Sequence, residues 1–310
     1  MKKLQGQLVK NNFVCLLFLL LLTIIFASNT FAHDDDHERQ HNSIELDDIK
    51  AKAKTPIQLY VFNCGTIVAN ELSLFNPALE VGMQKTLSNT CYLIKHPKGT
   101  LMWDAGLPDS LATIPGGTTV FDGAFTISVE KTLKSQLEEI GIDPLEIDFV
   151  ALSHLHFDHI GNANYFTNST WLIQQSEYAV AFGEAAVQAG FDSTAYNELA
   201  DNPTITLNGH YDVFGDKSVV VISAPGHTVG HQMLYLDLPQ TGPVVLSGDL
   251  YHFMENRLNY GVPVFNSSIR ESIHSFVLID NFLDQSKAQF WIQHDKPTFD
   301  SLSLSPAFYQ

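Results

Sequence analysis

The stretch Ser153-His154-Leu155-His156-Phe157-Asp158-His159-Ile160-Gly161-Asn162 decides the fold of this chain, because four potential metal ligands fall within six residues. His154 and His156 lie two positions apart, so at the end of an extended strand their side chains point the same way. Asp158 and His159 then need a tight turn to face a neighbouring point. The apolar run 147–152 indicates a buried strand that ends in this loop, the usual place for a site in an α/β protein. The alternative is a polar loop of surface histidines, but such a loop would not require a buried strand directly before it. We therefore predict two ligand pairs that face two metal ions.

Three further candidate ligands each follow an apolar run and a turn. His227 comes after residues 219–222, Asp249 follows Val244-Val245, and His294 follows residues 290–293. One such residue could be a buried core histidine with satisfied hydrogen bonds. Three of them downstream of an HxHxDH loop predict the rest of a binuclear metal centre.

This set of motifs resembles that of the metallo-β-lactamase superfamily, over about residues 57–294. The resemblance implies an α/β (α+β) fold, a four-layer αββα sandwich whose site lies where loops of both halves meet. It also implies two zinc ions per chain, although other divalent metals could replace them. The implied ligands of one zinc are His154, His156 and His227, those of the other are Asp158, His159 and His294, and Asp249 bridges the two.

Within that superfamily, the chain is most similar to the N-acyl-homoserine lactonases. The similar stretches are SHLHFDHIGN at 153–162, APGHT at 224–228 and GDLYH at 248–252. Many lactonases carry a Tyr three residues after the bridging Asp, where its hydroxyl helps to hold the substrate carbonyl. Here that position is His252, and Tyr251 stands one residue earlier. An imidazole N–H could donate the same hydrogen bond, so both residues remain candidates for this catalytic role.

The activity implied by the resemblance is hydrolysis of the lactone ring of N-acyl-homoserine lactones by a metal-bridging hydroxide. Zinc lowers the pKa of bound water to about 7, so no Ser or Cys nucleophile is needed. Asp158 would also orient the hydroxide. The alternatives are phosphotriester or β-lactam hydrolysis at the same centre, and a zinc-binding protein without turnover. Asp249 disfavours the β-lactamase branch, whose zinc sites lack a bridging carboxylate at that position.

Other residues beside the motifs are expected to support the site. Asp104 follows the apolar run 101–103, and both it and His231 are candidates to orient a metal ligand. The side chains expected to hold an acyl tail neighbour ligands or His252, with ordinary core packing as the alternative, and they are Phe157, Phe253 and Met254.

The first 32 residues have the pattern of a signal peptide. Lysines at positions 2, 3 and 10 precede the apolar run 13–27, and Thr30-Phe31-Ala32 resembles a cleavage site. An uncleaved membrane anchor is the alternative, because the apolar run is about long enough to insert. We expect cleavage and export to the periplasm or the medium. Residues 33–55 are polar and predict a flexible linker, and residues 56–310 predict one hydrolase domain.

The charge of the chain restricts its partners. Without residues 1–32, which hold three Lys and no acids, 14 Lys and Arg remain against 34 Asp and Glu, a formal charge of −20. Binding to phosphate requires a cationic surface, so nucleic acid and anionic membranes are poor partners. A small neutral lactone is the expected substrate. A monomer and a homodimer both remain open.

Two cysteines remain after the expected cleavage, and they lie near the ends of two predicted strands. Cys64 follows the strand 57–63, and Cys91 begins the strand 91–94. A disulfide would be allowed in an oxidising compartment if those strands pair antiparallel. Because spacing alone cannot establish bridge geometry, we favour two small buried side chains and keep the disulfide as the alternative.

Two helices and one insertion complete the expected secondary structure. A helix capped by Ser128 would bury Val129, Leu133, Leu137 and Ile140, spaced as one helical face. Residues 176–208 predict an insertion of helices and loops that forms a wall of the site. A second helix at 268–283 would turn inward the apolar side chains Ile269, Ile273, Phe276 and Leu283.

Overall fold

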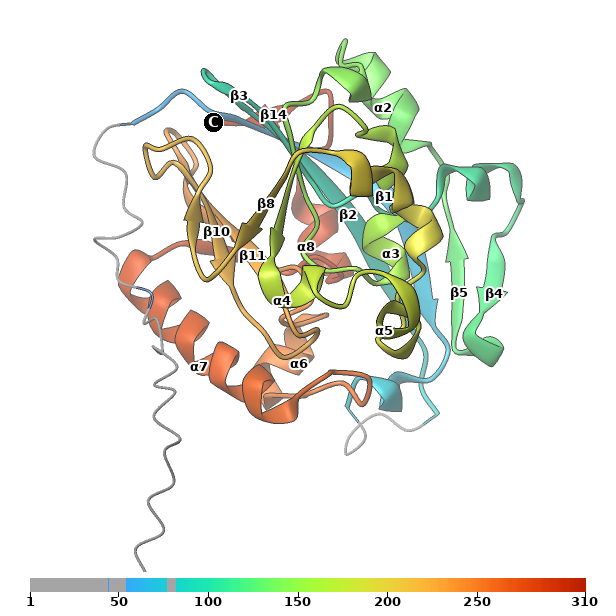
Figure 1. The fold of residues 1–310 in the computed structure, drawn as a ribbon. Coiled ribbons are helices and arrows are strands. Elements are labelled where there is room, and N and C mark those ends of the chain that lie inside the picture. The colour runs from blue at the N-terminus through green and yellow to red at the C-terminus, as the bar shows by residue number, and fades with distance from the viewer. Residues whose placement is uncertain (1–43, 45–53, 77–81) are drawn as a thin grey trace, which may run out of the picture. The chain divides into compact units, whose positions relative to one another are not determined.

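The computed structural model describes residue 44, residues 54–76 and residues 82–310 (Figure 1). The predicted signal peptide and most of the predicted linker lie outside this range. Ile44, which falls in the linker, is buried among the apolar residues of the domain. None of the helices within the described ranges has the length and apolar character needed to cross a bilayer.

A nine-stranded sheet carries the first half of the domain. Its path is β4-β5-β1-β2-β3-β6-β7-β8, and β14 pairs with β1. The strands are β1 Gln58–Ala69, β2 Lys85–His96, β3 Gly99–Trp103, β4 Thr118–Val120, β5 Phe125–Ser128, β6 Phe149–Ala151, β7 Thr170–Gln174, β8 Thr204–Leu207 and β14 Phe308–Tyr309. Pairing is parallel from β3 through β6 and β7 to β8, so the carboxyl ends of these strands lie at one edge.

A five-stranded sheet carries the second half, in the order β13-β12-β11-β10-β9. Its strands are β9 Tyr211–Asp212, β10 Val219–Ser223, β11 Gln232–Leu238, β12 Gly242–Leu246 and β13 Gln289–Trp291. The apolar runs 219–222 and 244–245, which precede His227 and Asp249, lie in β10 and β12, and β11 pairs between these two strands.

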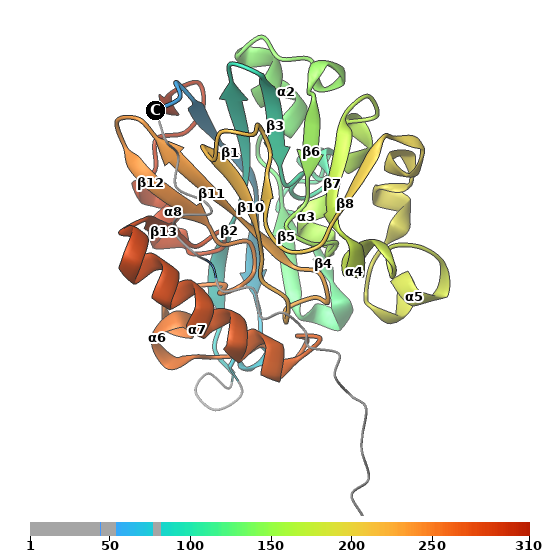
Figure 2. The same ribbon diagram turned by 60° about the vertical axis from the view of Figure 1, so that its left-hand side comes forward.

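Helices cover the outer faces of both sheets. The α-helices are α2 Leu133–Glu139, α3 Phe157–Ile160, α4 Gln175–Tyr178, α5 Gly183–Gln188, α6 Met254–Asn259, α7 Ile269–Ser286 and α8 Lys296–Ser301. The short 3-10 helices are η1 Leu72–Leu74, η2 Asp109–Thr113, η3 Phe121–Gly123, η4 Pro144–Glu146, η5 Ala163–Tyr165, η6 Ser193–Ala195 and η7 Asn197–Asp201. In Figure 2, α7 lies at the lower left beside the smaller sheet, while α2 lies at the top and α5 at the lower right.

Alternating side chains of the strands build three apolar layers. Along β10, Val219 and Val221 pack into the layer between the sheets, and Val220 and Ile222 pack into the layer beneath α7. A third layer lies between the larger sheet and the helices α2 to α5. Burying a Val or Ile side chain contributes about 1.5–3 kcal/mol, and both faces of β10 are apolar, so this strand stabilises two layers at once. The predicted four-layer sandwich is confirmed.

Three details of the predicted elements were wrong. The first helix begins at Leu133 with Thr132 as its cap, because residues up to Ser128 extend β5. The insertion contains the strand β8 besides its helices. In α7 the Ser268 cap is present, but Ile269 is 68% exposed and Ile273 38%, so neither turns inward.

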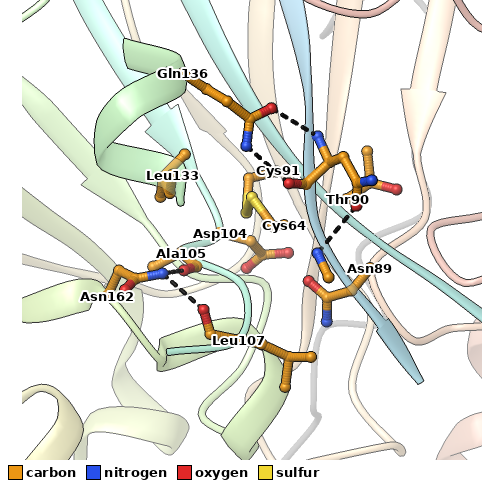
Figure 3. Close-up of a disulfide and its surroundings, with 12 residues drawn as sticks. Cys64, Asn89, Thr90, Cys91, Asp104, Ala105, Leu107, Leu133, Gln136 and Asn162 are labelled. Carbon is orange, nitrogen blue, oxygen red and sulfur yellow. Dashed lines mark hydrogen bonds between the residues drawn. A yellow bond between two sulfur atoms is a disulfide. The ribbon is translucent and has the colours of Figure 1, made fainter. Parts of the chain in front are cut away.

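Cys64 and Cys91 form a disulfide between β1 and β2, so the expectation of two separate buried side chains was wrong (Figure 3). The strands pair antiparallel with Phe62 opposite Cys91, and a bulge between Asn63 and Gly65 brings Cys64 into reach. The loop after β3 packs closely on this bond, since a side chain at Gly106 would meet Cys64 Cβ at 2.3 Å.

Candidate metal centre

The loop after β6 places its four candidate ligands as the sequence predicts. His154 and His156 precede α3, and Asp158 and His159 lie within it. The tight turn expected between the two pairs is therefore one turn of helix. His156 is the residue that caps this helix, with extended backbone angles. The change from extended to helical backbone lets one short segment present two ligand pairs in two directions.

Three imidazole nitrogens converge at a first metal position. His154 Nε2 lies 2.9 Å from His156 Nδ1 and 3.0 Å from His227 Nε2, and the last two atoms are 2.9 Å apart. A neutral imidazole has one N–H, and all three rings are buried or nearly so. Three ring nitrogens this close together cannot all be satisfied by one another. A cation coordinated by their lone pairs resolves the conflict, and zinc favours such nitrogen ligands.

The other ring nitrogens of two of these ligands are held from behind. Ser153 Oγ lies 3.1 Å from His154 Nδ1, and Asn266 Oδ1 lies 2.9 Å from His227 Nδ1. A proton on His227 Nδ1 that is donated to Asn266 leaves the lone pair of Nε2 free for a metal. Such partners orient a ligand ring and fix its tautomer.

A second metal position is formed by the group Asp158, His159, Asp249 and His294. His294 Nε2 lies 3.3 Å from His159 Nε2 and 3.4 Å from Asp158 Oδ2. All four side chains are buried. Two imidazoles and two carboxylates suit zinc, and they also suit manganese, iron or cobalt.

Buried partners also orient the ligands of the second position. His159 Nδ1 lies 3.0 Å from Asp104 Oδ2, so the predicted contact between Asp104 and a ligand is present. His294 Nδ1 donates to the carbonyl oxygen of Ser88 at 2.7 Å. Gln293 Nε2 in turn donates to Asp104 Oδ2 at 2.7 Å. The Nε2 atoms of His159 and His294 are thereby directed at the second metal position.

Asp249 lies between the two positions, as predicted. Its Oδ1 is 2.9 Å from His294 Nε2 and 3.1 Å from His159 Nε2, while its Oδ2 is 3.3 Å from His227 Nε2. Oδ1 is buried and makes no hydrogen bond of good geometry with any described residue. One oxygen directed at each position is the arrangement of a bridging carboxylate.

The turn that carries Asp249 requires a glycine. Gly248 has a φ of +49°, and a Cβ there would meet His231 Nε2 at 2.6 Å. That nitrogen accepts the backbone N–H of Asp249 at 2.9 Å, and the other ring nitrogen of His231 donates to the carbonyl oxygen of Ala224. His231 therefore orients the backbone of Asp249, in agreement with its predicted supporting position.

The protonation states of the first position suit a metal. Burial, first of all, lowers the pKa of His154 and His156 well below the usual value of a histidine. Burial alone would raise the pKa of the Asp249 carboxyl, but His294 and His159 hold it well below its usual value. Neutral imidazoles and an ionised carboxylate are the forms that bind metals.

Negative charge accumulates at the second position. Burial alone would lower the pKa of His159, but Asp249, Asp158 and Asp104 raise it well above the usual value of a histidine. The pKa of His294 is also raised, because Asp249 and Asp158 outweigh its burial. The carboxylates thus favour positive charge between them, and a divalent cation supplies it.

The structure separates the two candidates for the carbonyl donor. His252 Nε2 lies 3.1 Å from Asp249 Oδ2, and burial lowers the pKa of His252 to about 4, so its ring is neutral near neutral pH. Tyr251 points the other way, and its ring stacks on Phe276 of α7 at 4.2 Å. Tyr251 does not line the cavity, because the side chains of successive residues point apart here and this one fills the layer beneath α7.

A cavity of about 400 Å³ opens onto the metal positions. Its polar end is formed by the ligands His156, Asp158, Asp249 and His294, together with His252. Its other walls are largely apolar, and they are made by Ile67, Leu74, Phe75, Leu87, Phe121, Ala124, Phe125, Phe157, Phe265 and the segment 188–190. The polar end of a bound small molecule can therefore contact the metal positions while its apolar chain is held by aromatic side chains.

Only one of the three predicted tail contacts lies at this cavity. Phe157 lines it, as expected. Phe253 is instead buried in the core near the cavity, and Met254 is 38% exposed at the start of α6. The segment 188–190 confirms that the insertion forms part of the wall.

Several side chains that shape the site have no recognisable signature in the sequence. Asn266 stands in no recognisable catalytic motif. Phe121 begins the 3-10 helix η3, and Phe75 and Phe265 lie on two separate loops. Glu177, on α4, accepts hydrogen bonds from the backbone of both loops that carry the first-position ligands. Only the fold brings these residues to the ligands.

Known proteins match this chain over most of its length. The model of the metallo-beta-lactamase superfamily matches residues 85–282. The N-acyl homoserine lactonase AttM of Azorhizobium caulinodans is 28% identical over 266 residues, 82% of this chain and 99% of that protein. The N-acyl homoserine lactonase AiiA of Bacillus thuringiensis subsp. kurstaki is 26% identical and aligns over 81% of this chain and 98% of its own.

A solved structure of an N-acyl homoserine lactone hydrolase, with the product N-hexanoyl-L-homoserine bound at its catalytic metal center, is also similar. Its TM-score is 0.70 at 26% identity, and the match covers 83% of this chain and all of that one. The family model spans well over half of the chain and includes six of the seven predicted ligands, with His294 just beyond its end. The chain belongs to the metallo-beta-lactamase superfamily.

Proposed function

We propose that this protein is a metal-dependent hydrolase that opens the lactone ring of N-acyl-homoserine lactones. The observation that carries the proposal is the cavity, which joins a buried His and Asp cluster at one end to aromatic walls at the other. A homoserine lactone with an acyl tail has the same division into a polar reacting end and an apolar chain. The names of the relatives support the same substrate class.

Two metal ions, with zinc as the first candidate, would be held by the seven His and Asp ligands described above. When bound, they would polarise the substrate carbonyl and lower the pKa of water to about 7, which supplies a nucleophile at neutral pH. Asp249 would hold both ions at a fixed separation. Asp158 lies at the cavity surface beside the second position, where its carboxylate can orient the attacking water.

His252 is the residue we propose as hydrogen-bond donor to the carbonyl oxygen. It lines the cavity, and its ring is held edge-on to Phe75 at 4.8 Å. Its neutral ring can carry a proton on Nε2, the atom that faces Asp249 and the first position. A donor fixed in this way stabilises the charge that develops on the oxygen as the ring opens.

A substrate panel tests the proposal. The metal-loaded protein should hydrolyse N-acyl-homoserine lactones with a higher kcat/KM than lactones without an acyl tail, β-lactams or phosphotriesters. The aromatic walls bury apolar area of the tail, and each buried CH₂ contributes about 0.8 kcal/mol, so longer tails should raise kcat/KM until the cavity is filled. A higher kcat/KM for the phosphotriester would favour that alternative activity. Absence of turnover with every class, at full metal content, would favour a metal-binding protein without catalysis.

We further propose that the protein is exported and that residues 1–32 are removed. The sequence pattern of these residues supports this proposal, and so does the disulfide, since disulfides persist in oxidising compartments. The protein from its native compartment should begin near His33 and remain in the soluble fraction. Intact-mass measurement checks the cleavage. A mass that includes the apolar run, with the protein in the membrane fraction, would favour an uncleaved anchor.

A further inference from the structure

Glu177 is a buried carboxylate that no step of the proposed chemistry uses. It is 1% exposed and lies on α4, directly after β7 of the larger sheet. A buried carboxylate is costly unless hydrogen bonds compensate for its lost hydration. Its two oxygens accept hydrogen bonds from two different loops, and each of those loops carries ligands of the first metal position.

The two hydrogen bonds join segments that are far apart in sequence. Glu177 Oε1 accepts the backbone N–H of Leu155 at 3.2 Å, and Oε2 accepts that of Gly230 at 2.8 Å. Leu155 stands between the ligands His154 and His156, on the loop after β6. Gly230 lies on the loop after β10 of the smaller sheet, which carries His227. The carboxylate therefore links the two halves of the fold at the first position.

Backbone packing at Gly230 is a second, independent observation. A Cβ at this residue would lie 2.5 Å from Glu177 Cβ and 2.6 Å from Glu177 N, closer than packed atoms approach. Ser176 Oγ also donates to the carbonyl oxygen of Val229 at 3.0 Å. The loop with His227 is thus seated directly on the first turn of α4, and only glycine permits that approach.

We propose that Glu177 is a positioning residue that fixes the two ligand-bearing loops of the first metal position relative to each other. It belongs neither to the candidate ligand groups nor to the lining of the cavity, and it acts through the backbone of Leu155 and Gly230. This inference rests on the metal centre of the proposed function, but it does not depend on the substrate.

The second position has a different support, which makes the proposal selective. His159 is held by Asp104 and His294 by the carbonyl oxygen of Ser88. Asn89 Nδ2 donates to the carbonyl oxygen of Asp158 at 2.8 Å. None of these contacts involves Glu177, so its loss should affect the first position alone.

Cadmium NMR of the whole protein, titrated with Cd²⁺ alone, tests the proposal through Glu177→Gln. An amide offers one acceptor oxygen where the carboxylate offers two, and its NH₂ would oppose one of the backbone N–H groups. We expect two resonances in the unsubstituted protein. In the variant, the affinity of one position should fall by about 10- to 100-fold, as when the partners of a metal ligand are lost, while the other position keeps its affinity.

Asp109→Asn is the matched control. Asp109 is also a buried carboxylate that accepts two backbone N–H groups, those of Leu133 at 2.7 Å and Lys134 at 3.1 Å. This variant should lose thermal stability without selective loss of one cadmium resonance. If Glu177→Gln does not fold, Gly230→Ala provides the same test, because its Cβ separates the loop from α4 and leaves the carboxylate in place. Unchanged affinity at both positions, or equal loss at both, would overturn the proposal.

Discussion

Asp249→Ala is expected to weaken metal binding at both positions and, because the metals are needed for turnover, to reduce kcat as well. Removing a residue that only orients a ligand typically costs 10- to 100-fold in metal affinity, so removing a bridging ligand should cost at least about 100-fold. The reason is that Oδ1 faces His159 and His294 while Oδ2 faces His227. Elemental analysis after dialysis, together with kcat, measures the two effects.

Asp284→Ala is the control for that experiment. Asp284 is exposed on α7, away from the ligands, so this variant should retain its metal and its activity. Asp249→Asn should fall between the wild type and the alanine variant, because an amide keeps one oxygen of the bridge. Full loading with two metals in Asp249→Ala would contradict the bridging role.

His252→Ala should reduce turnover far more than metal content. Loss of a donor to a developing oxyanion costs about 3 kcal/mol in comparable sites, or about 100-fold in kcat. His252 stands outside the two ligand groups that the motifs define, although its ring nitrogen also lies near those of His227 and Asp249 in a third group that could hold a metal. Parallel measurement of kcat, KM and metal content separates the catalytic effect from loss of the ions.

Two further variants decide which neighbour acts on the carbonyl. Tyr251→Phe should leave kcat unchanged, since the Tyr251 ring stacks on Phe276 and its hydroxyl is buried without a hydrogen-bond partner among the described residues. His252→Gln keeps an N–H donor and should recover part of the lost turnover. A large loss of kcat in Tyr251→Phe, with no loss in His252→Ala, would make Tyr251 the carbonyl donor in place of His252.

The clustering of the candidate metal ligands could be predicted from the sequence, because each follows an apolar strand that the fold brings to one edge. His154 and His156 are close in sequence, and their spacing alone directs them to one point. His227, Asp249 and His294 are distant in sequence, but each stands after a strand of the same sheet, so the strand order places them together. The four layers of the sandwich could be predicted from the same apolar runs and from their alternation with helical segments.

Other features depend on contacts that have no local signature. The inward face of α7 begins with Ser272 and Ser275, since a Cβ at Gly226 would meet Ser272 N at 2.3 Å and only small residues fit against that loop. Apolar spacing therefore selected Ile269 and Ile273, which the close approach leaves outside. The disulfide likewise depends on the bulge beside Cys64, which spacing does not reveal.

Proton release from N-acyl-homoserine lactones tests the central claim most directly. Ring opening yields a carboxylic acid that ionises at neutral pH, since carboxyl pKa values lie near 4. The metal-loaded wild type should release one proton for each ring opened, with N-acyl-homoserine as the product by mass, and removal of the metals by a chelator should stop the release. No proton release from short- or long-chain lactones, together with rapid hydrolysis of a phosphotriester, would contradict the lactonase assignment and leave the metal centre in place.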